Sequence, residues 1–439
     1  MKRTARLLAC SLLLFAYPRG VGAERVASSA TWEYQFPPGI VDFTAMQLTP
    51  GIRYLAVTTG RSTYEGSDSA GSVTSEGENA AYYFDLRDKR LLWRKPFPSE
   101  TAVSVVGLSP SGDILALGVG GTSTRQTTVA LRSYQGDSAL EGKRALGAPE
   151  AGARLYDREG RLLAAGIPLE RFSGTLPYAG QLLLRPARAG ETAPSDDLRR
   201  TLTDAGVTAV PKFTARGAYG FMESAGHKQF VSFAQDGTEN WRWELPPGQG
   251  ELAREWRGFA ASPDLGYALV SLTPYEGERP SDVRRLYLFG RSEGLLWEYQ
   301  APMMIAGKHA ARSIGMQIAN AASSALVVRT GPRASVVDAL DRSGVVRHSW
   351  EFDEMKPAAY SLSPNGHYWA AVLRQTWQGA TSVDKGWTAG LHVFDCDTGE
   401  VVWRSPAMAD AVYVIAMDTA GVVAVSPATR TLAVFDPPG

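Results

Sequence analysis

One repeat of about fifty residues organises this chain of 439 residues. Four tryptophans close a similar phrase at intervals of 54, 53 and 53 residues. They are Trp243, Trp297, Trp350 and Trp403. A second landmark, a Ser-Pro turn, recurs at Pro110, Pro263 and Pro364, with gaps of 153 and 101 residues. Two independent landmarks with one period predict an array of stacked supersecondary units.

Each period reads as four short strands. The clearest one contains AAYSLSP, HYWAAVLR, GLHVFDCD and EVVWRSP, between residues 358 and 406. Short β-branched and aromatic segments separated by proline and glycine turns are typical of strands. Units of about 50 residues with four strands each are the signature of propeller blades. We therefore predict an all-β fold, a single β-propeller of four-stranded antiparallel blades.

Counting the positions at which each repeat makes its first turn predicts eight blades, with seven as the alternative. Eight positions are candidates for the first turn of a blade. They lie near Pro50, Pro110, Gly160, Ala215, Pro263, Ala319, Pro364 and Thr419. The units between residues 120 and 245 are partly degenerate, which keeps the seven-bladed alternative open. A single short helix is predicted at residues 195–206.

The two ends of the chain each carry an incomplete unit. Residues 32–38, WEYQFPP, repeat the second half of LYLFGRSEGLLWEYQAP at 286–302 without its first half. The last unit ends after its third strand, TLAVFD. We therefore predict that residues 31–36 pair with residues 431–435, because closing the ring removes free strand edges.

The first 23 residues read as a secretory signal peptide, followed by the propeller domain at 24–439. Basic residues precede an apolar run, and Val21-Gly22-Ala23 offers the small residues of a cleavage site. About eight apolar residues are too few to span a bilayer, which needs roughly 20. Cys10 precedes the apolar run, which argues against anchoring as a lipoprotein. The sequence thus predicts an exported protein, periplasmic or secreted, that does not span the membrane.

Charge and cysteine content exclude several classes of partner and site. The chain has 45 basic and 45 acidic residues, so nothing favours nucleic acid as a partner. Only Cys396 follows the leader, in a strand pattern that predicts a packed residue and not a nucleophile. The five histidines lack metal-ligand spacing, and most of them are expected at surface or strand-edge positions. They are His227, His309, His348, His367 and His392.

The phrase VFDCDTGEVVW, Val393 to Trp403, resembles the tryptophan-docking repeat of the quinoprotein (PQQ-like) propeller superfamily, which is related to WD40-like propellers. Asp395, Thr398 and Gly399 match its turn. Partial matches are Asp85 with Trp93, Ser292 and Gly294 with Trp297, and Asp341, Ser343 and Gly344 with Trp350. The resemblance implies that each tryptophan packs against a neighbouring blade, and it implies no activity.

The cofactor of the superfamily's dehydrogenases is not expected here. The resemblance implies PQQ held over Ca²⁺ beside a disulfide of adjacent cysteines, and this chain has no adjacent cysteines. No set of carboxylates and amides is assignable to calcium, so we predict no cofactor, no metal and no catalytic residue. A propeller enzyme with a channel site, either a quinone-dependent dehydrogenase or a lyase or hydrolase, stays open as the alternative.

Three long loops carry the predicted site. When the strands of a blade are lettered A to D, the B–C loops share one face with the connections between blades. The long B–C loops are residues 60–80, 273–282 and 374–387. Binding usually resides on long loops held by a rigid scaffold. We predict a non-catalytic scaffold of the bacterial envelope that binds a protein, peptide or glycan through Tyr64, Glu65, Tyr275, Glu276, Trp377 and Trp387.

Overall fold

The computed structural model describes twenty parts of the chain. They are residues 30–37, 42–49, 53–60, 63–64, 73–74, 79–98, 101–109, 111–121, 152–167, 212–214, 217–224, 227–234, 239–244, 255–273, 275–276, 279–280, 282–305, 309–376, 387–417 and 421–436. Most of these residues form strands, and the described helical elements are two three-residue 3-10 turns, η3 (Asn320–Ala322) and η5 (Pro406–Met408).

The described strands form seven four-stranded antiparallel sheets, which we number as blades 1 to 7 in chain order. Blade 1 contains β2 (Asp42–Leu48), β3 (Tyr54–Gly60), β6 (Asn79–Asp85) and β7 (Arg90–Phe97). Blade 2 contains β8 (Thr101–Leu108), β9 (Ile114–Gly121), β10 (Gly152–Asp157) and β11 (Leu162–Ile167). Blade 3 contains β12 (Lys212–Thr214), β13 (Gly217–Ser224), β14 (His227–Ala234) and β15 (Glu239–Glu244). Blade 4 contains β16 (Glu255–Ala261), β17 (Tyr267–Thr273), β20 (Val283–Gly290) and β21 (Gly294–Pro302).

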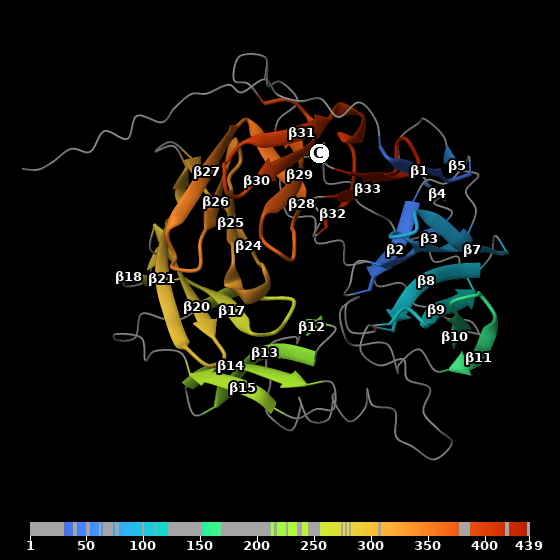
Figure 1. The fold of residues 1–439 in the computed structure, drawn as a ribbon, viewed down its shortest axis with the longest axis horizontal. Coiled ribbons are helices and arrows are strands. Elements are labelled where there is room, and N and C mark those ends of the chain that lie inside the picture. Colours follow the sequence, from blue (N-terminus) through green and yellow to red (C-terminus); the bar gives the residue numbers. More distant parts are fainter. Residues whose placement is uncertain are drawn as a thin grey trace, which may run out of the picture.

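The remaining blades complete the ring. Blade 5 contains β24 (Ser313–Ile318), β25 (Ala325–Thr330), β26 (Ala334–Leu340) and β27 (Val346–Asp353). Blade 6 contains β28 (Met355–Leu362), β29 (Tyr368–Gln375), β30 (Gly390–Asp395) and β31 (Val401–Ser405). Blade 7 contains β32 (Tyr413–Ala416), β33 (Val422–Ser426), β34 (Thr431–Phe435) and β1 (Trp32–Gln35). Figure 1 shows the sheets arranged around a centre, with the first strand of each blade innermost. The fold is a β-propeller, as predicted.

The two ends of the chain meet in blade 7. Strand β1 pairs antiparallel with β34, with Trp32 opposite Val434 and Gln35 opposite Thr431. The backbone N–H of Phe36 donates to Arg430 O at 2.9 Å, which continues the pairing by one residue. The predicted closure of the ring by an N-terminal strand is confirmed.

Seven of the eight predicted first turns fall between the first and second strands of a blade. Gly160 does not, and the blade predicted around it is wrong. Gly160 lies in the turn between β10 and β11, the third and fourth strands of blade 2. Both kinds of turn place a residue at positive φ, which glycine favours, as Gly112 (φ 73°) and Gly160 (φ 79°) show, so composition alone does not separate them. Residues 168–211, with the helix predicted at 195–206, lie outside the described residues, and the number of blades stays a prediction.

The repeated tryptophans join consecutive blades. Trp297 on the fourth strand of blade 4 packs on Gly344, where a Cβ would come within 2.6 Å of the indole ring. Trp350 on the fourth strand of blade 5 donates from Nε1 to Gly399 O at 2.9 Å. Both glycines lie in the turn between the third and fourth strands of the next blade. The same relation joins Trp93 to Gly160 and Trp243 to Gly294. The predicted packing of these tryptophans against neighbouring blades is confirmed, and it explains why tryptophan and turn glycine keep one period.

Cys396 is fully buried beside the core between blades 5 and 6, as predicted for a packed residue. Burial raises the pKa of its thiol to about 12. Because the thiolate is the reactive form, we expect the native protein to resist a thiol-specific disulfide reagent at pH 8 and to react once unfolded in guanidinium. Absorbance of the released chromophore measures both reactions, and rapid labelling of the native protein would contradict this prediction.

Candidate functional site

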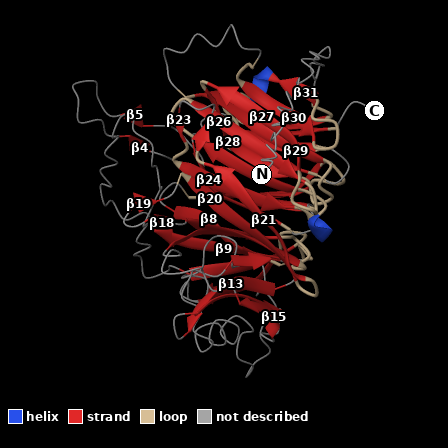
Figure 2. Ribbon diagram, turned by 90° about the vertical axis from the view of Figure 1, so that its left-hand side faces the viewer, coloured by secondary structure: helices blue, strands red, loops and turns tan. Residues whose placement is uncertain are grey.

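Three short hairpins project from one face of the propeller. Strands β4 (Thr63–Tyr64) and β5 (Val73–Thr74) pair within the B–C loop of blade 1, and β18 (Tyr275–Glu276) pairs with β19 (Arg279–Pro280) in that of blade 4. Strands β22 (Met304–Ile305) and β23 (His309–Ala310) pair in the connection between blades 4 and 5. Figure 2 shows β4, β5, β18, β19 and β23 on the same side of the molecule. We call this side the loop face.

The predicted site residues divide into three groups. Tyr64 lies in hairpin strand β4, and Tyr275 and Glu276 form strand β18, so these three belong to the loop face. Glu65 and Trp377 lie outside the described residues. Trp387 is described and belongs to the third long loop.

Trp387 packs into the protein more deeply than the sequence indicates. Its ring lies edge-on to Phe352 of blade 5, with 4.8 Å between ring centroids, and its Nε1 donates to Glu351 O at 3.0 Å. It also contacts the core cluster between blades 5 and 6. These contacts give Trp387 a packing role at the seam between two blades, and its role in ligand binding stays a prediction. Replacing it would therefore disturb folding as well as any binding surface.

A cavity of about 470 Å³ lies between blades 5 and 6. Its lining includes Ser313 and Thr330 from blade 5 and Lys356, Tyr360 and Arg374 from blade 6. Strands β24 and β28 begin at Ser313 and Met355, and strands β25 and β29 end at Thr330 and Gln375. Those strand ends are the ones from which the B–C loops and blade connections leave, so the cavity lies at the loop face, beside the innermost strands.

Two cross-strand pairs supply the polar groups of the cavity. Ser313 lies opposite Thr330 on β24 and β25, and Lys356 lies opposite Arg374 on β28 and β29. The Arg374 guanidinium donates from Nε and Nη2 to the carbonyl oxygens of residues 409–411, at 2.7 to 3.3 Å. No aspartate or glutamate is among the lining residues that the structure describes. The guanidinium of Arg374 lies toward blade 7, whereas Ser313 and Thr330 belong to the blade 5 side of the cavity.

Tyr360 closes the inner end of the cavity. Its hydroxyl lies against Gly315 of β24, where a Cβ would overlap the phenol oxygen. Burial raises the pKa of Tyr360, so the hydroxyl stays protonated at neutral pH. Gln317 Nε2 donates to the backbone oxygen of Tyr360 at 3.2 Å, and Gln317 Oε1 accepts from the backbone N–H of Leu362 at 2.6 Å. Blade 5 therefore fixes the backbone that carries the tyrosine.

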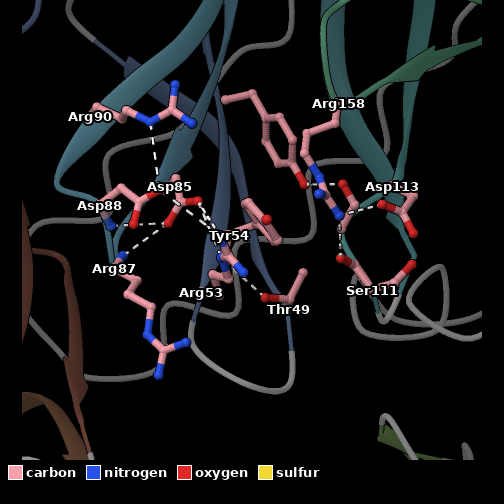
Figure 3. A network of polar contacts seen from close by, with 12 residues as sticks. Thr49, Arg53, Tyr54, Asp85, Arg87, Asp88, Arg90, Ser111, Asp113 and Arg158 are labelled. Carbon is pink, nitrogen blue, oxygen red and sulfur yellow. Dashed lines mark hydrogen bonds and ion pairs between the residues drawn. The ribbon is translucent and has the colours of Figure 1, made fainter.

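The opposite face is consolidated by ion pairs between turns (Figure 3). Asp85 pairs with Arg53 at 3.1 Å and caps its own turn by accepting from two backbone N–H groups. The guanidinium groups of Arg53 and Arg158 lie 5.0 and 4.8 Å from the centroid of the Tyr54 ring. Arg158 also pairs with Asp113. These contacts join blades 1 and 2, and the polar groups of the turns bind to one another.

The described histidines include one buried residue. His392 is fully buried, and desolvation lowers its pKa to about 4, so it is an exception to the expected surface or strand-edge positions. His367 is exposed and His348 is half-buried, and both meet one aspartate turn of the opposite face: His367 Nδ1 lies 2.7 Å from Asp397 Oδ2, and His348 Nε2 lies 2.8 Å from Asp397 O. Within the described part of the chain, no three histidine, cysteine, aspartate or glutamate side chains form a metal-binding group.

A network around a buried ion pair links blades 4 and 5, and no sequence pattern predicted it. Arg329 Nη2 lies 2.7 Å from Asp338 Oδ2, and the two side chains are 7% and 3% exposed. Asp338 also accepts from Tyr299 Oη of blade 4 at 2.9 Å and from Ser349 Oγ at 2.7 Å. Arg329 Nη1 donates to Pro302 O of blade 4 at 2.7 Å. This network is structural, because its groups are all turned toward one another.

Comparison with known proteins finds similarity to solved structures alone. No family model matches the chain, and no curated protein matches it. The β-propeller domain of Cps50 (Swd1) from Myceliophteria thermophila is 10% identical, with a TM-score of 0.41 over 92% of this chain and 100% of that one. The C-terminal WD40 domain of Sif2 is 10% identical, with a TM-score of 0.40 over 95% of this chain and 100% of its own. Hydrazine synthase of Kuenenia stuttgartiensis is 8% identical, with a TM-score of 0.41 over 92% and 97%.

Such distant likenesses carry no argument about the site. The propeller assignment rests on the seven sheets and the closure by β1, and the quinoprotein resemblance stays a prediction. Among the described residues, no helix has the length and apolar character needed to cross a membrane.

Proposed function

We propose that the chain is a non-catalytic binding propeller that holds a protein, peptide or glycan on its loop face. One observation carries the proposal: the described hairpins and the cavity lie on the same face. Long loops on a rigid scaffold and concave sites with a few convergent polar groups are both typical of binding surfaces. The opposite face uses its polar groups in contacts between turns. The fold by itself does not specify a ligand.

Action in the bacterial envelope is part of the same proposal. It rests on the leader at residues 1–23, which resembles a secretory signal. Fractionation of cells expressing the full chain tests it, with the mature form expected outside the cytoplasm.

The binding proposal predicts that loop-face aromatics matter and turn-face residues do not. The mature chain 24–439 is screened against a random peptide display library and a glycan array. For the hits obtained, we expect Tyr64→Ala, Tyr275→Ala and Trp377→Ala each to weaken binding by more than about 1 kcal/mol, which is roughly five-fold in affinity. Calorimetry of the purified variants with each hit gives the measurement.

Matched controls lie on the opposite face. Arg87 and Arg291 are exposed residues of turns between third and fourth strands, and their replacement by alanine should leave affinity unchanged. Equal losses from both faces would contradict the proposal. So would a rise in melting temperature on adding PQQ with Ca²⁺ that a chelator reverses, because that result would favour the channel enzyme.

A further inference from the structure

We infer that His392 makes the attachment of Trp387 to the seam between blades 5 and 6 sensitive to acid, so that Trp387 is released from the seam in mildly acidic surroundings. The inference concerns how the end of the third long loop is attached to the ring. It goes beyond the proposed function, because it can be tested without a ligand.

Trp387 is half-buried and is held from two sides. On the blade 5 side its ring packs on Phe352, and its Nε1 donates to Glu351 O at 3.0 Å. On the blade 6 side its ring lies edge-on to His392, with 6.1 Å between the ring centroids and 70° between the ring planes. The ring of Phe394 lies 5.7 Å away on the same side. A titratable side chain is therefore part of the surface on which the tryptophan packs.

The segment between Trp387 and β30 is fixed at two points. Arg404 Nη1 of β31 donates to Thr388 Oγ1 at 2.7 Å. Gly390, the first residue of β30, has φ 147°, and a Cβ there would come within 2.9 Å of Ser405 O. Glycine has more conformational freedom than any other residue, so the chain before it can move while the rest of β30 stays paired.

His392 is enclosed by uncharged groups and one cation among the described residues. It is fully buried and lies opposite Ala371 on β29 and opposite Arg404 on β31. The Phe394 ring stacks on it, with 6.0 Å between centroids. Glu351 of blade 5 contacts Trp387 through its backbone oxygen and is itself exposed. A proton on His392 would therefore place a second positive charge opposite the guanidinium that holds Thr388, and like charges in this relation destabilise a sheet.

Burial lowers the pKa of His392 from 6.5 to about 4, and the charge of Arg404 lowers it further in the same direction. Attraction between an imidazolium and an aromatic ring acts within about 6 Å, so the rings of Phe394 and Trp387 lie at its limit and offset little of this cost. The packed state thus holds the histidine neutral. Release of Trp387 would open the imidazole to water and return its pKa toward 6.5.

The sign of the pH dependence follows from this difference. The packed state is fully favoured above pH 6.5, and its advantage over the released state is lost as the pH falls from 6.5 to 4, because the released state takes up the proton first. Between pH 7 and pH 5, pKa values of about 4 and 6.5 raise the equilibrium constant for release about twenty-fold.

Fluorine NMR of the mature chain labelled with 5-fluorotryptophan tests the inference. The resonance of Trp387 is the one that Trp387→Phe removes, and the other tryptophans serve as internal references. We expect saturation-transfer spectra to show a released population of Trp387 about twenty times larger at pH 5 than at pH 7. A Trp387 resonance with the same position and the same exchange at both pH values would overturn the inference.

Variants of two histidines separate this response from a general effect of acid. His392→Phe retains a flat ring and cannot take up a proton, so it should abolish the response; His392→Leu provides the same test should the larger ring disturb packing. The control is His367→Gln, which removes an exposed histidine from the opposite end of blade 6 and should leave the response unchanged. An acid response that persists in both His392 variants, or that disappears in His367→Gln, would contradict the inference. The loop-face proposal is read from the effects of Tyr64→Ala and Tyr275→Ala on ligand affinity, so the two can fail independently.

Discussion

Removing residues 24–37 is expected to abolish the cooperative unfolding of the ring. The deletion takes away β1, the fourth strand of blade 7, and with it Phe36, which is 1% exposed. Trp32 and Tyr34 on the same strand contact Phe84 of blade 1, with ring centroids 6.1 and 5.1 Å apart. Loss of a buried aromatic side chain such as Phe36 costs about 3–5 kcal/mol, and loss of the half-buried Trp32 and Tyr34 adds to this, against a total stability of about 5–15 kcal/mol for a typical domain.

The measurement is thermal unfolding followed by circular dichroism. A shorter deletion of residues 24–29, which retains β1, should melt like the mature chain and serves as the control. A synthetic peptide of residues 30–37 added to the longer deletion should restore part of the transition, because the exposed edge of β34 is available to pair. A melting temperature within about 2 °C of the intact chain for the longer deletion would show that closure contributes little.

The architecture was predictable because one contact is repeated between blades. At four seams a fourth-strand tryptophan packs on a glycine in the next blade's turn, and a side chain at Gly344 would collide with Trp297. Both residues therefore keep the same period, and the incomplete units at the two ends could be matched to each other. The prediction failed at Gly160 because first and third turns share the same requirement for positive φ, and only strand pairing distinguishes them.

Of the candidate site, the sequence predicted only the face of the propeller on which it lies. Loop lengths indicated which side would carry hairpins, and β4–β5 and β18–β19 lie there. The cavity could not be predicted, because its cross-strand pairs come from two blades and involve residues that look like ordinary exposed strand positions. The packing of Trp387 could not be predicted for a related reason: an aromatic in a long loop carries no sign of whether it packs on the adjacent blade, as this one does on Phe352.

Replacing Asp338 by alanine is expected to destabilise the protein by about 3–5 kcal/mol. The change would leave the guanidinium of Arg329, which is 7% exposed, without its carboxylate. Tyr299 Oη and Ser349 Oγ would also lose the acceptor to which they donate. Removing one member of a buried pair is costly because the remaining charge has neither water nor a partner. Urea unfolding monitored by tryptophan fluorescence gives the free energy of unfolding.

Two further variants determine whether the cost comes from the unpaired charge. The double variant Arg329→Met with Asp338→Leu removes both charges, and it should recover most of the stability, because apolar residues of similar volume can replace a buried ion pair. Tyr299→Phe removes only one donor to Asp338 and should cost about 1 kcal/mol. If the double variant were as unstable as Asp338→Ala, the network would act through its particular hydrogen bonds between blades 4 and 5. Those bonds, and not charge compensation, would then be what this seam of the ring requires.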